Sequence, residues 1–217
     1  NFYGVLTVWE KYRSDPLAHA YEEIHGRTTH GLQLQTYGVA QTATSYYSVR
    51  SGVGLALLYH PRRLQTPPQS LRVGAVGLGV GTVAVYARPG DSFRFYEINP
   101  EVIRLSGRYF SYVSQCKGRV TVVPGDARLS LEREAERGEL QQFDVLVVDA
   151  FTGDAIPVHL LTDEAFTLYL KHLRPLQGVL AVHISNRSLD LEPVVARLAE
   201  HYGLNSILIH APEHGTA

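Results

Sequence analysis

The 217-residue chain contains no methionine and a single cysteine, Cys116. One cysteine excludes an internal disulfide and suits a reducing compartment, so we expect a cytoplasmic location. The sequence has no apolar run of the length that a membrane helix needs and no visible signal peptide. Because it opens at Asn1 rather than at a methionine, we expect a processed chain or a piece cut from a longer protein.

The chain also lacks an excess of charge of either sign. Its formal net charge is −1, and no basic stripe stands out along the sequence. The electrostatic footprint of a nucleic-acid-binding protein is therefore missing, and we expect no nucleic-acid partner. A composition with 45% hydrophobic and 19% charged residues favours a globular protein. This length is enough for one α/β domain with a small additional part.

From Leu71 onward, apolar strand-like runs alternate with helix-like segments. The expected strands are Leu71–Val76, Ser92–Tyr96, Arg119–Val123, Phe143–Val148, Gly178–Ile184 and Ser206–His210. The expected helices are Thr82–Ala87, Pro100–Tyr109, Ala127–Arg137, Thr162–Leu173 and Glu192–His201. This alternation predicts an α/β, Rossmann-like fold with a mostly parallel sheet covered on both faces.

The first 60 residues have a different pattern, with short β-like runs broken by glycines. They predict antiparallel hairpins, so we expect residues 1–60 to form a small β-rich subdomain. Residues 61–70 are Pro-rich and are expected to be a linker. Residues 71–217 then form the Rossmann-like catalytic domain.

The stretch "GLGVG" places Gly77, Gly79 and Gly81 between an expected strand and an expected helix. Glycines there allow a tight turn and let a ligand approach the backbone without a Cβ in the way. Glu97 ends the next strand, 20 positions after Gly77, where a carboxylate can accept hydrogen bonds from both hydroxyls of a ribose. The frame predicts a nucleoside site. The alternative is a tight turn of an α/β fold without a ligand.

A second acid indicates which nucleoside the site would hold. Asp126, in "PGDAR", ends the third strand beside Ala127, where it can bind the exocyclic amine of adenine. Acids at the ends of two adjacent strands fit one adenosine better than a pyrophosphate-linked dinucleotide. A negative lining would also suit a sulfonium, so the pattern indicates S-adenosylmethionine or a close relative.

Two further acids follow the central strand "FDVLVVD". Asp149 ends that strand and should face the ligand crevice, because ligands of open parallel sheets bind beyond the carboxyl ends of the strands. Asp154 follows in the loop "AFTGDAIP". Together the two carboxylates could hold an incoming amine and accept its proton. The alternatives are a capping role for Asp149 and a solvated turn for Asp154.

These motifs resemble the spermidine synthase family of polyamine aminopropyltransferases, and the likeness covers nearly the whole chain. It is closest to bacterial spermidine-synthase-like domains, some of which are fused to membrane transporter-like segments. The resemblance implies a class I methyltransferase-like fold preceded by a β-hairpin subdomain. It also implies a fused membrane segment outside this chain as one arrangement, which would make this the cytoplasmic domain of a membrane protein.

The resemblance also assigns roles to individual residues. Glu97 binds ribose, Asp126 binds adenine and Asp149 is the amine-orienting base. Tyr46 and Tyr47, in "SYY", lie where a tyrosine motif closes over the substrates, and Gln33 matches a glutamine of the N-terminal hairpins.

Three positions depart from the family pattern. Val80 stands where the family carries an acid that grips the amine of the aminopropyl group, and Ser48 stands where an acid follows the tyrosine motif. The two acids after the central strand, Asp149 and Asp154, are five residues apart rather than close together. These departures leave adenosyl binding intact but question the use of decarboxylated S-adenosylmethionine and of a simple diamine.

The leading hypothesis is an enzyme that moves an aminopropyl-type group from an adenosyl sulfonium to a small-molecule amine or polyamine. S-adenosylmethionine or its decarboxylated form would be a co-substrate, without a prosthetic group. The alternatives are a methyltransferase, a lyase or cyclase that releases methylthioadenosine, and a non-catalytic sensor domain. His25 and His30 lack an evident third ligand, so no metal site is expected. His183 closes the fifth strand and could reach the crevice, but it is interpreted as a satisfied buried histidine. We expect a homodimer.

Overall fold

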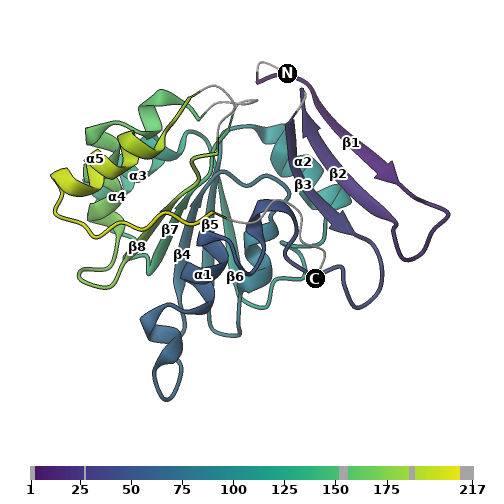
Figure 1. Ribbon diagram of the computed structural model, residues 1–217, viewed down its shortest axis with the longest axis horizontal. Helices are drawn as coiled ribbons and strands as arrows, with labels where there is room; N and C mark the ends of the chain where they lie inside the picture. The colour runs from purple at the N-terminus through teal and green to yellow at the C-terminus, as the bar shows by residue number, and fades with distance from the viewer. Residues whose placement is uncertain (1–2, 27, 152–155, 186–188, 211–217) are drawn as a thin grey trace.

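The computed structural model describes residues 3–26, 28–151, 156–185 and 189–210 (Figure 1). Within these residues the chain forms two sheets. The N-terminal one is antiparallel, with the order β1-β2-β3, and the other is parallel, with the order β6-β5-β4-β7-β8. The antiparallel strands are β1 (Leu6–Lys11), β2 (Ala20–His25) and β3 (Thr28–Leu34). The parallel strands are β4 (Arg72–Val76), β5 (Ser92–Glu97), β6 (Arg119–Pro124), β7 (Val145–Val148) and β8 (Val179–Val182). The predicted Rossmann-like sheet and N-terminal hairpins are confirmed.

Helices cover both faces of the parallel sheet (Figure 1). One face packs against α1 (Gly52–Leu58), the 3-10 helix η3 (Thr82–Tyr86) and α2 (Pro100–Tyr109). The other packs against α3 (Ala127–Glu136), α4 (Asp163–His172) and α5 (Glu192–His201). The remaining short 3-10 helices are η1 (Ser45–Tyr47), η2 (Pro61–Leu64) and η4 (Val158–Leu160). Within the described residues, every helix is too short or too polar to cross a membrane.

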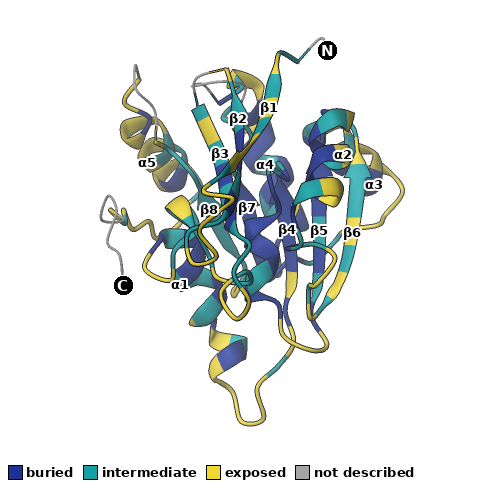
Figure 2. Ribbon diagram, turned by 90° about the vertical axis from the view of Figure 1, so that its right-hand side faces the viewer, coloured by how far each residue is buried: buried dark blue, intermediate teal, exposed yellow. Residues whose placement is uncertain are grey.

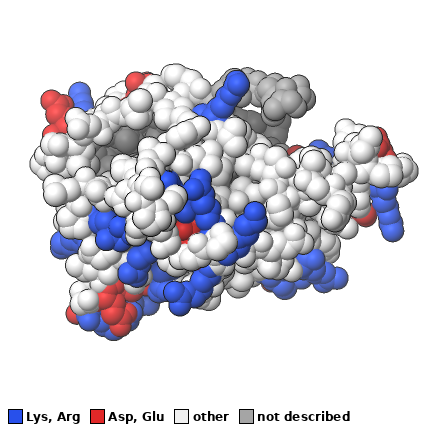
Figure 3. Space-filling model, turned by 90° about the horizontal axis from the view of Figure 1, so that it is seen from below, with Lys and Arg blue, Asp and Glu red and all other residues white. Residues whose placement is uncertain are grey.

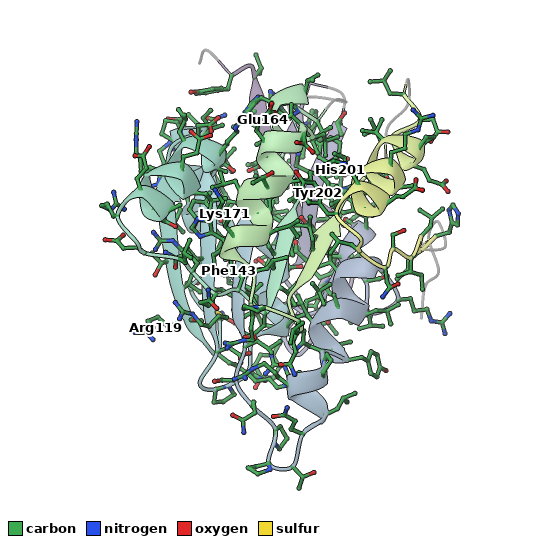
Figure 4. The ribbon with its side chains drawn as sticks, turned by 90° about the vertical axis from the view of Figure 1, so that its left-hand side faces the viewer. Arg119, Phe143, Glu164, Lys171, His201 and Tyr202 are labelled. Carbon is green, nitrogen blue, oxygen red and sulfur yellow. The ribbon has the colours of Figure 1, made fainter. Side chains whose placement is uncertain are left out.

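The helix boundaries follow from local capping chemistry. The Asn99 side chain accepts a hydrogen bond from the Glu101 backbone N–H at 3.0 Å, and Pro100 occupies the first turn of α2. The Thr162 hydroxyl caps α4 in the same way. At this same end of α4, the Tyr202 hydroxyl donates to the Asp163 carbonyl at 2.9 Å and so ties the end of α5 to the start of α4 (Figure 4).

Strand β7, next to the central β4, is buried on both sides. All four residues of β7 are buried, and the dark strands in the middle of Figure 2 show this two-sided core. The carboxyl ends of the parallel strands meet at one edge of the sheet. A pocket lined by described residues lies at this edge. At the opposite edge Arg72, Arg94 and Arg119 line a separate hollow, on the face where Lys and Arg predominate (Figure 3). The two ends of the sheet are therefore chemically different.

Three elements differ from the sequence-based expectation. Ser206–His210 is not a strand: it pairs with no other segment among the described residues, and Ile207 is 83% exposed, although its apolar pattern is typical of a β-strand. The segment Thr82–Ala87 contains a 3-10 helix rather than a full α-helix. An unexpected helix, α1, forms in the Gly-rich sequence "GVGLALL". Its Ser51 cap and the burial of Val53 and Leu57 against the sheet outweigh the low helix propensity of its glycines.

Candidate active site

The glycine turn begins directly after β4. Gly77, Gly79 and Gly81 all have positive φ angles, of 98°, 51° and 87°, which residues with a Cβ rarely adopt. A Cβ on Gly77 would collide with the carbonyl oxygen of Asp149. Glycine is therefore required at this position both by backbone conformation and by the close approach of the end of β7.

Glu97, at the end of β5, holds this turn in place. One carboxylate oxygen accepts a hydrogen bond from the Leu78 backbone N–H at 2.9 Å, and the other accepts one from the Asn99 N–H at 2.8 Å. Burial raises the pKa of Glu97, and these backbone hydrogen bonds oppose that rise. Each oxygen keeps a second lone pair, so the carboxylate can still accept hydrogen bonds from a ligand.

Asp126 begins α3 at the end of β6. Its Oδ1 accepts a hydrogen bond from the Leu129 N–H at 2.9 Å, which makes it the helix cap, and its Oδ2 lies 3.1 Å from Nε2 of His159. Ala127 follows with its side chain buried beside the pocket. The capping bond orients the carboxylate and leaves Oδ2 at the pocket wall.

Asp149 is held by two side chains from distant parts of the chain. Its Oδ1 lies 2.6 Å from Nδ1 of His183, just beyond β8, and its Oδ2 accepts a hydrogen bond from the Tyr47 hydroxyl of η1. The Asp149 side chain is only 4% exposed, and this burial raises the pKa of its carboxyl, while the bond to His183 lowers it. The carboxylate is therefore fixed in orientation by hydrogen bonds on both of its oxygens.

The tyrosine pair packs over this group. The Tyr46 ring centroid lies 4.6 Å from that of Tyr47 and 4.5 Å from that of His183. The Tyr86 hydroxyl donates to the Tyr47 carbonyl and so anchors η1 to the core. Burial and the nearby charges of Asp149 and Glu23 raise the pKa of Tyr46 far above its usual range, so its hydroxyl stays neutral.

One pocket brings most of the predicted residues together, between the glycine turn and the antiparallel sheet. The predicted residues that line it are Gly77, Gly79, Tyr46, Tyr47, Glu97, Asp126, Ala127 and Asp149. Glu23 of β2 also lines it and was not predicted. His183 was interpreted as a satisfied buried histidine, and it is in fact bonded to Asp149. Its place at the carboxyl edge of the sheet was the signal available in the sequence.

Two other predicted residues, Gln33 and Gly81, lie outside the pocket lining. Gln33 is buried away from the pocket lining, with its Nε2 donating to the Ala40 carbonyl at 2.8 Å and to the Ser111 hydroxyl at 2.9 Å. Gly81 lies against Val113 at the start of η3 rather than in the pocket. Asp154 falls outside the described residues. Among the described residues, no group of three or more His, Cys, Asp or Glu side chains could hold a metal ion.

Replacing Gly77 with alanine should destabilise the protein by about 2–4 kcal/mol, because strain at positive φ adds to the collision with the Asp149 carbonyl. Gly107→Ala is a matched control: Gly107 lies in α2 with no atom near its added Cβ, and alanine there should stabilise by about 0.5–1 kcal/mol. Urea unfolding of both variants measures the difference. Equal stability of Gly77→Ala and the parent would show that the turn is not held as described.

A parallel sheet with a glycine turn after its central β4 and acids at the ends of β5, β6 and β7 defines a class I methyltransferase-like fold. In sequence the chain is similar to polyamine aminopropyltransferases. It is 33% identical over 160 residues to a polyamine aminopropyltransferase of Vibrio vulnificus, an alignment that covers 73% of this chain and 50% of the relative. The chain thus spans about half the length of that curated relative. No protein-family model matches it.

Solved structures confirm the fold. A probable spermidine synthase from Corynebacterium glutamicum superimposes with a TM-score of 0.56 at 20% identity, covering 80% of this chain and 58% of the other. Human methyltransferase-like protein 13, in complex with SAH, superimposes with a TM-score of 0.52 at 24% identity, covering 68% and 69% of the two chains. At these identities the likeness shows the shared fold alone.

Proposed function

We propose that this chain is a transferase that moves an aminopropyl-type group from an adenosyl sulfonium to an amine and releases methylthioadenosine. The observation that carries the proposal is the buried Asp149, fixed by Tyr47 and His183 beside the glycine turn. The sequence likeness to a polyamine aminopropyltransferase supports the same reaction. The sulfonium donor would be S-adenosylmethionine or its decarboxylated form.

The donor would lie across the glycine turn. The Leu78 and Asn99 N–H groups each use one lone pair of the Glu97 carboxylate. Its remaining lone pairs would accept hydrogen bonds from the ribose hydroxyls. Asp126, with Ala127 beside it, would accept one from the exocyclic amine of adenine. The carboxylates that line the pocket would also favour a positive sulfur. The SAH in the methyltransferase-like protein 13 structure supports an adenosyl ligand for this fold.

In the transfer step the amine nitrogen would attack the aminopropyl carbon attached to sulfur. A carbon–nitrogen bond forms, the carbon–sulfur bond breaks, and its electron pair stays on sulfur, which leaves as a neutral thioether. That leaving group needs no acid, so positioning supplies most of the acceleration. The amine loses one proton, and Asp149, which lines the pocket, would accept it. Its burial makes the carboxylate more basic, and a cationic ligand beside it would keep it ionised until then.

Methyl transfer is the second candidate, and the surroundings of Val80 favour it. Val80 is buried against Phe110 and Tyr112, and it lies so close to Gly31 that no Cβ would fit there. The turn therefore offers no carboxylate for the amine of an aminopropyl group at this position. Some curated relatives are also methyltransferases, among them an N-terminal histidine N-methyltransferase of Emericella nidulans that is 33% identical over 109 residues.

Product analysis separates the candidates. The protein would be incubated with S-adenosylmethionine or its decarboxylated form, with and without a diamine, and the products identified by mass spectrometry. We expect methylthioadenosine together with a lengthened amine, formed only when the amine is present. S-adenosylhomocysteine would indicate a methyltransferase, and methylthioadenosine without an amine would indicate a lyase or cyclase. Binding without turnover would indicate a sensor and contradict the proposal.

A further inference from the structure

The antiparallel sheet contributes one carboxylate to the pocket. Glu23 of β2 lines the pocket together with Glu97 and Asp149, although it comes from the other sheet. Its side chain is buried, at 1% exposure for the residue as a whole. Within the described part of the chain, its Oε2 has no hydrogen-bond partner. It differs in this from Glu97 and Asp149, whose carboxylate oxygens all accept hydrogen bonds from the protein.

A buried carboxylate oxygen without a partner is costly to a folded protein. The electrostatic surroundings add to that cost, because burial and the negative charge of Glu97 raise the pKa of Glu23 to about 7. The charges of Glu23 and Asp149 both act on the Tyr46 hydroxyl, so the two carboxylates face the same part of the pocket. A positively charged hydrogen-bond donor from a ligand would relieve both the missing bond and the repulsion.

We propose that Glu23 binds an ammonium group of the ligand through Oε2 and thereby selects cationic substrates over neutral nucleosides. The inference rests on the proposed function, since it assigns the amine end of a substrate to the same pocket. A sulfonium carries charge but no N–H, and a neutral hydroxyl donates a hydrogen bond but carries no charge. An ammonium group supplies both the bond that Oε2 lacks and the positive charge that offsets the repulsion from Glu97. That group could belong to the sulfonium donor or to the acceptor amine, and separate titrations distinguish the two.

Proton release on binding follows from this assignment. A bound ammonium favours the ionised carboxylate, so near neutral pH Glu23 should give up a proton when the ligand binds. Affinity for an ammonium ligand should therefore rise between pH 6 and pH 8. Other titratable groups also face the pocket, namely Glu97, Asp126, Asp149, His25, His30, His159 and four tyrosines. The contribution of Glu23 is the part of the pH dependence that disappears in Glu23→Gln.

The test compares Glu23→Gln with the parent by calorimetry. Glu22→Gln is the matched control, because Glu22 is the adjacent residue of β2 and its carboxylate bonds to Thr29 and Lys11 rather than lining the pocket. One series titrates decarboxylated S-adenosylmethionine and neutral methylthioadenosine, and a second adds 1,4-diaminobutane to the methylthioadenosine complex. We expect Glu23→Gln to weaken the ammonium ligand that it contacts about 10–100-fold and methylthioadenosine less than twofold, whereas Glu22→Gln leaves both unchanged.

The outcomes distinguish a failure of the Glu23 assignment from a failure of the proposed function. A loss confined to the decarboxylated donor, or one confined to the diamine, supports the inference and identifies the source of the ammonium group. Equal affinities of Glu23→Gln and the parent for every ligand would overturn the role of Glu23 and leave the proposed function standing. Failure of the parent protein to bind any adenosyl ligand would overturn the proposed function and the inference with it.

Thermal unfolding shows that the variant is folded. Folding raises the pKa of Glu23 from 4.5 to about 7, so its ionisation destabilises the folded state progressively above pH 4.5 and fully above pH 7. Glu23→Gln removes that cost and should unfold at a higher temperature than the parent at pH 8, with a smaller difference at pH 5. A variant that gains stability while it loses the ammonium ligand separates a binding residue from a structural one.

Discussion

Asp149→Asn is expected to lower turnover about 10²–10⁴-fold, the range typical of a positioned general base. Asparagine preserves the size of the side chain and one acceptor oxygen, but it cannot take a proton from the attacking amine. The hydrogen bonds from Tyr47 and His183 show that the carboxylate is oriented before any substrate arrives. Removing the charge should therefore affect the transfer step much more than the shape of the site. Initial rates of methylthioadenosine formation measure the loss.

The affinity for methylthioadenosine is the internal control for this substitution. That product is neutral, and Asp149 should face the amine rather than the nucleoside, so its affinity should change little. Asp163→Asn offers a matched control on the surface, because Asp163 is exposed in the first turn of α4. Turnover of Asp149→Asn within a few-fold of the parent would exclude it as the base. Loss of both turnover and nucleoside affinity would show that Asp149 is a structural residue.

Glu97→Ala should weaken methylthioadenosine binding by about 1.5–3 kcal/mol, the usual contribution of hydrogen bonds to a charged group. The same carboxylate also holds the glycine turn through the Leu78 N–H, so the turn should loosen as well. Glu97→Gln retains one acceptor oxygen and should show a smaller loss. Calorimetry measures both variants against Glu101→Ala, which removes an exposed carboxylate of α2 paired with Arg104. Unchanged affinity in Glu97→Ala would disprove the ribose contact.

The parallel sheet could be predicted from the sequence because its signals are local. The strands after Leu71 are short, largely apolar runs, and α2, α3 and α4 begin at the recognisable caps Asn99, Asp126 and Thr162. Acids that end such strands must meet at the carboxyl edge of the sheet, whatever the details of packing. This is why Glu97, Asp126 and Asp149 were found from their positions alone.

The remaining features depend on contacts between distant segments. Glu23 reaches the pocket only because the antiparallel sheet packs beside the glycine turn, and its own strand gives no sign of that. The position of His183 at the end of its strand could be predicted, but its bond to Asp149 depends on β8 lying beside β7. The helix α1 forms in a Gly-rich sequence because Leu57 is buried against the sheet. Conversely, the apolar stretch Ser206–His210 finds no strand to pair with in the part of the chain that the structure describes.

The central claim is that the pocket transfers an aminopropyl-type group, and following that group by isotope tests it most directly. Decarboxylated S-adenosylmethionine labelled in its aminopropyl carbons would be incubated with the protein and a diamine. The mass of each product would then be determined by mass spectrometry. We predict that the label appears in the lengthened amine and that unlabelled methylthioadenosine forms in equal amount. An unlabelled, methylated amine with the label still attached to the nucleoside would contradict the account.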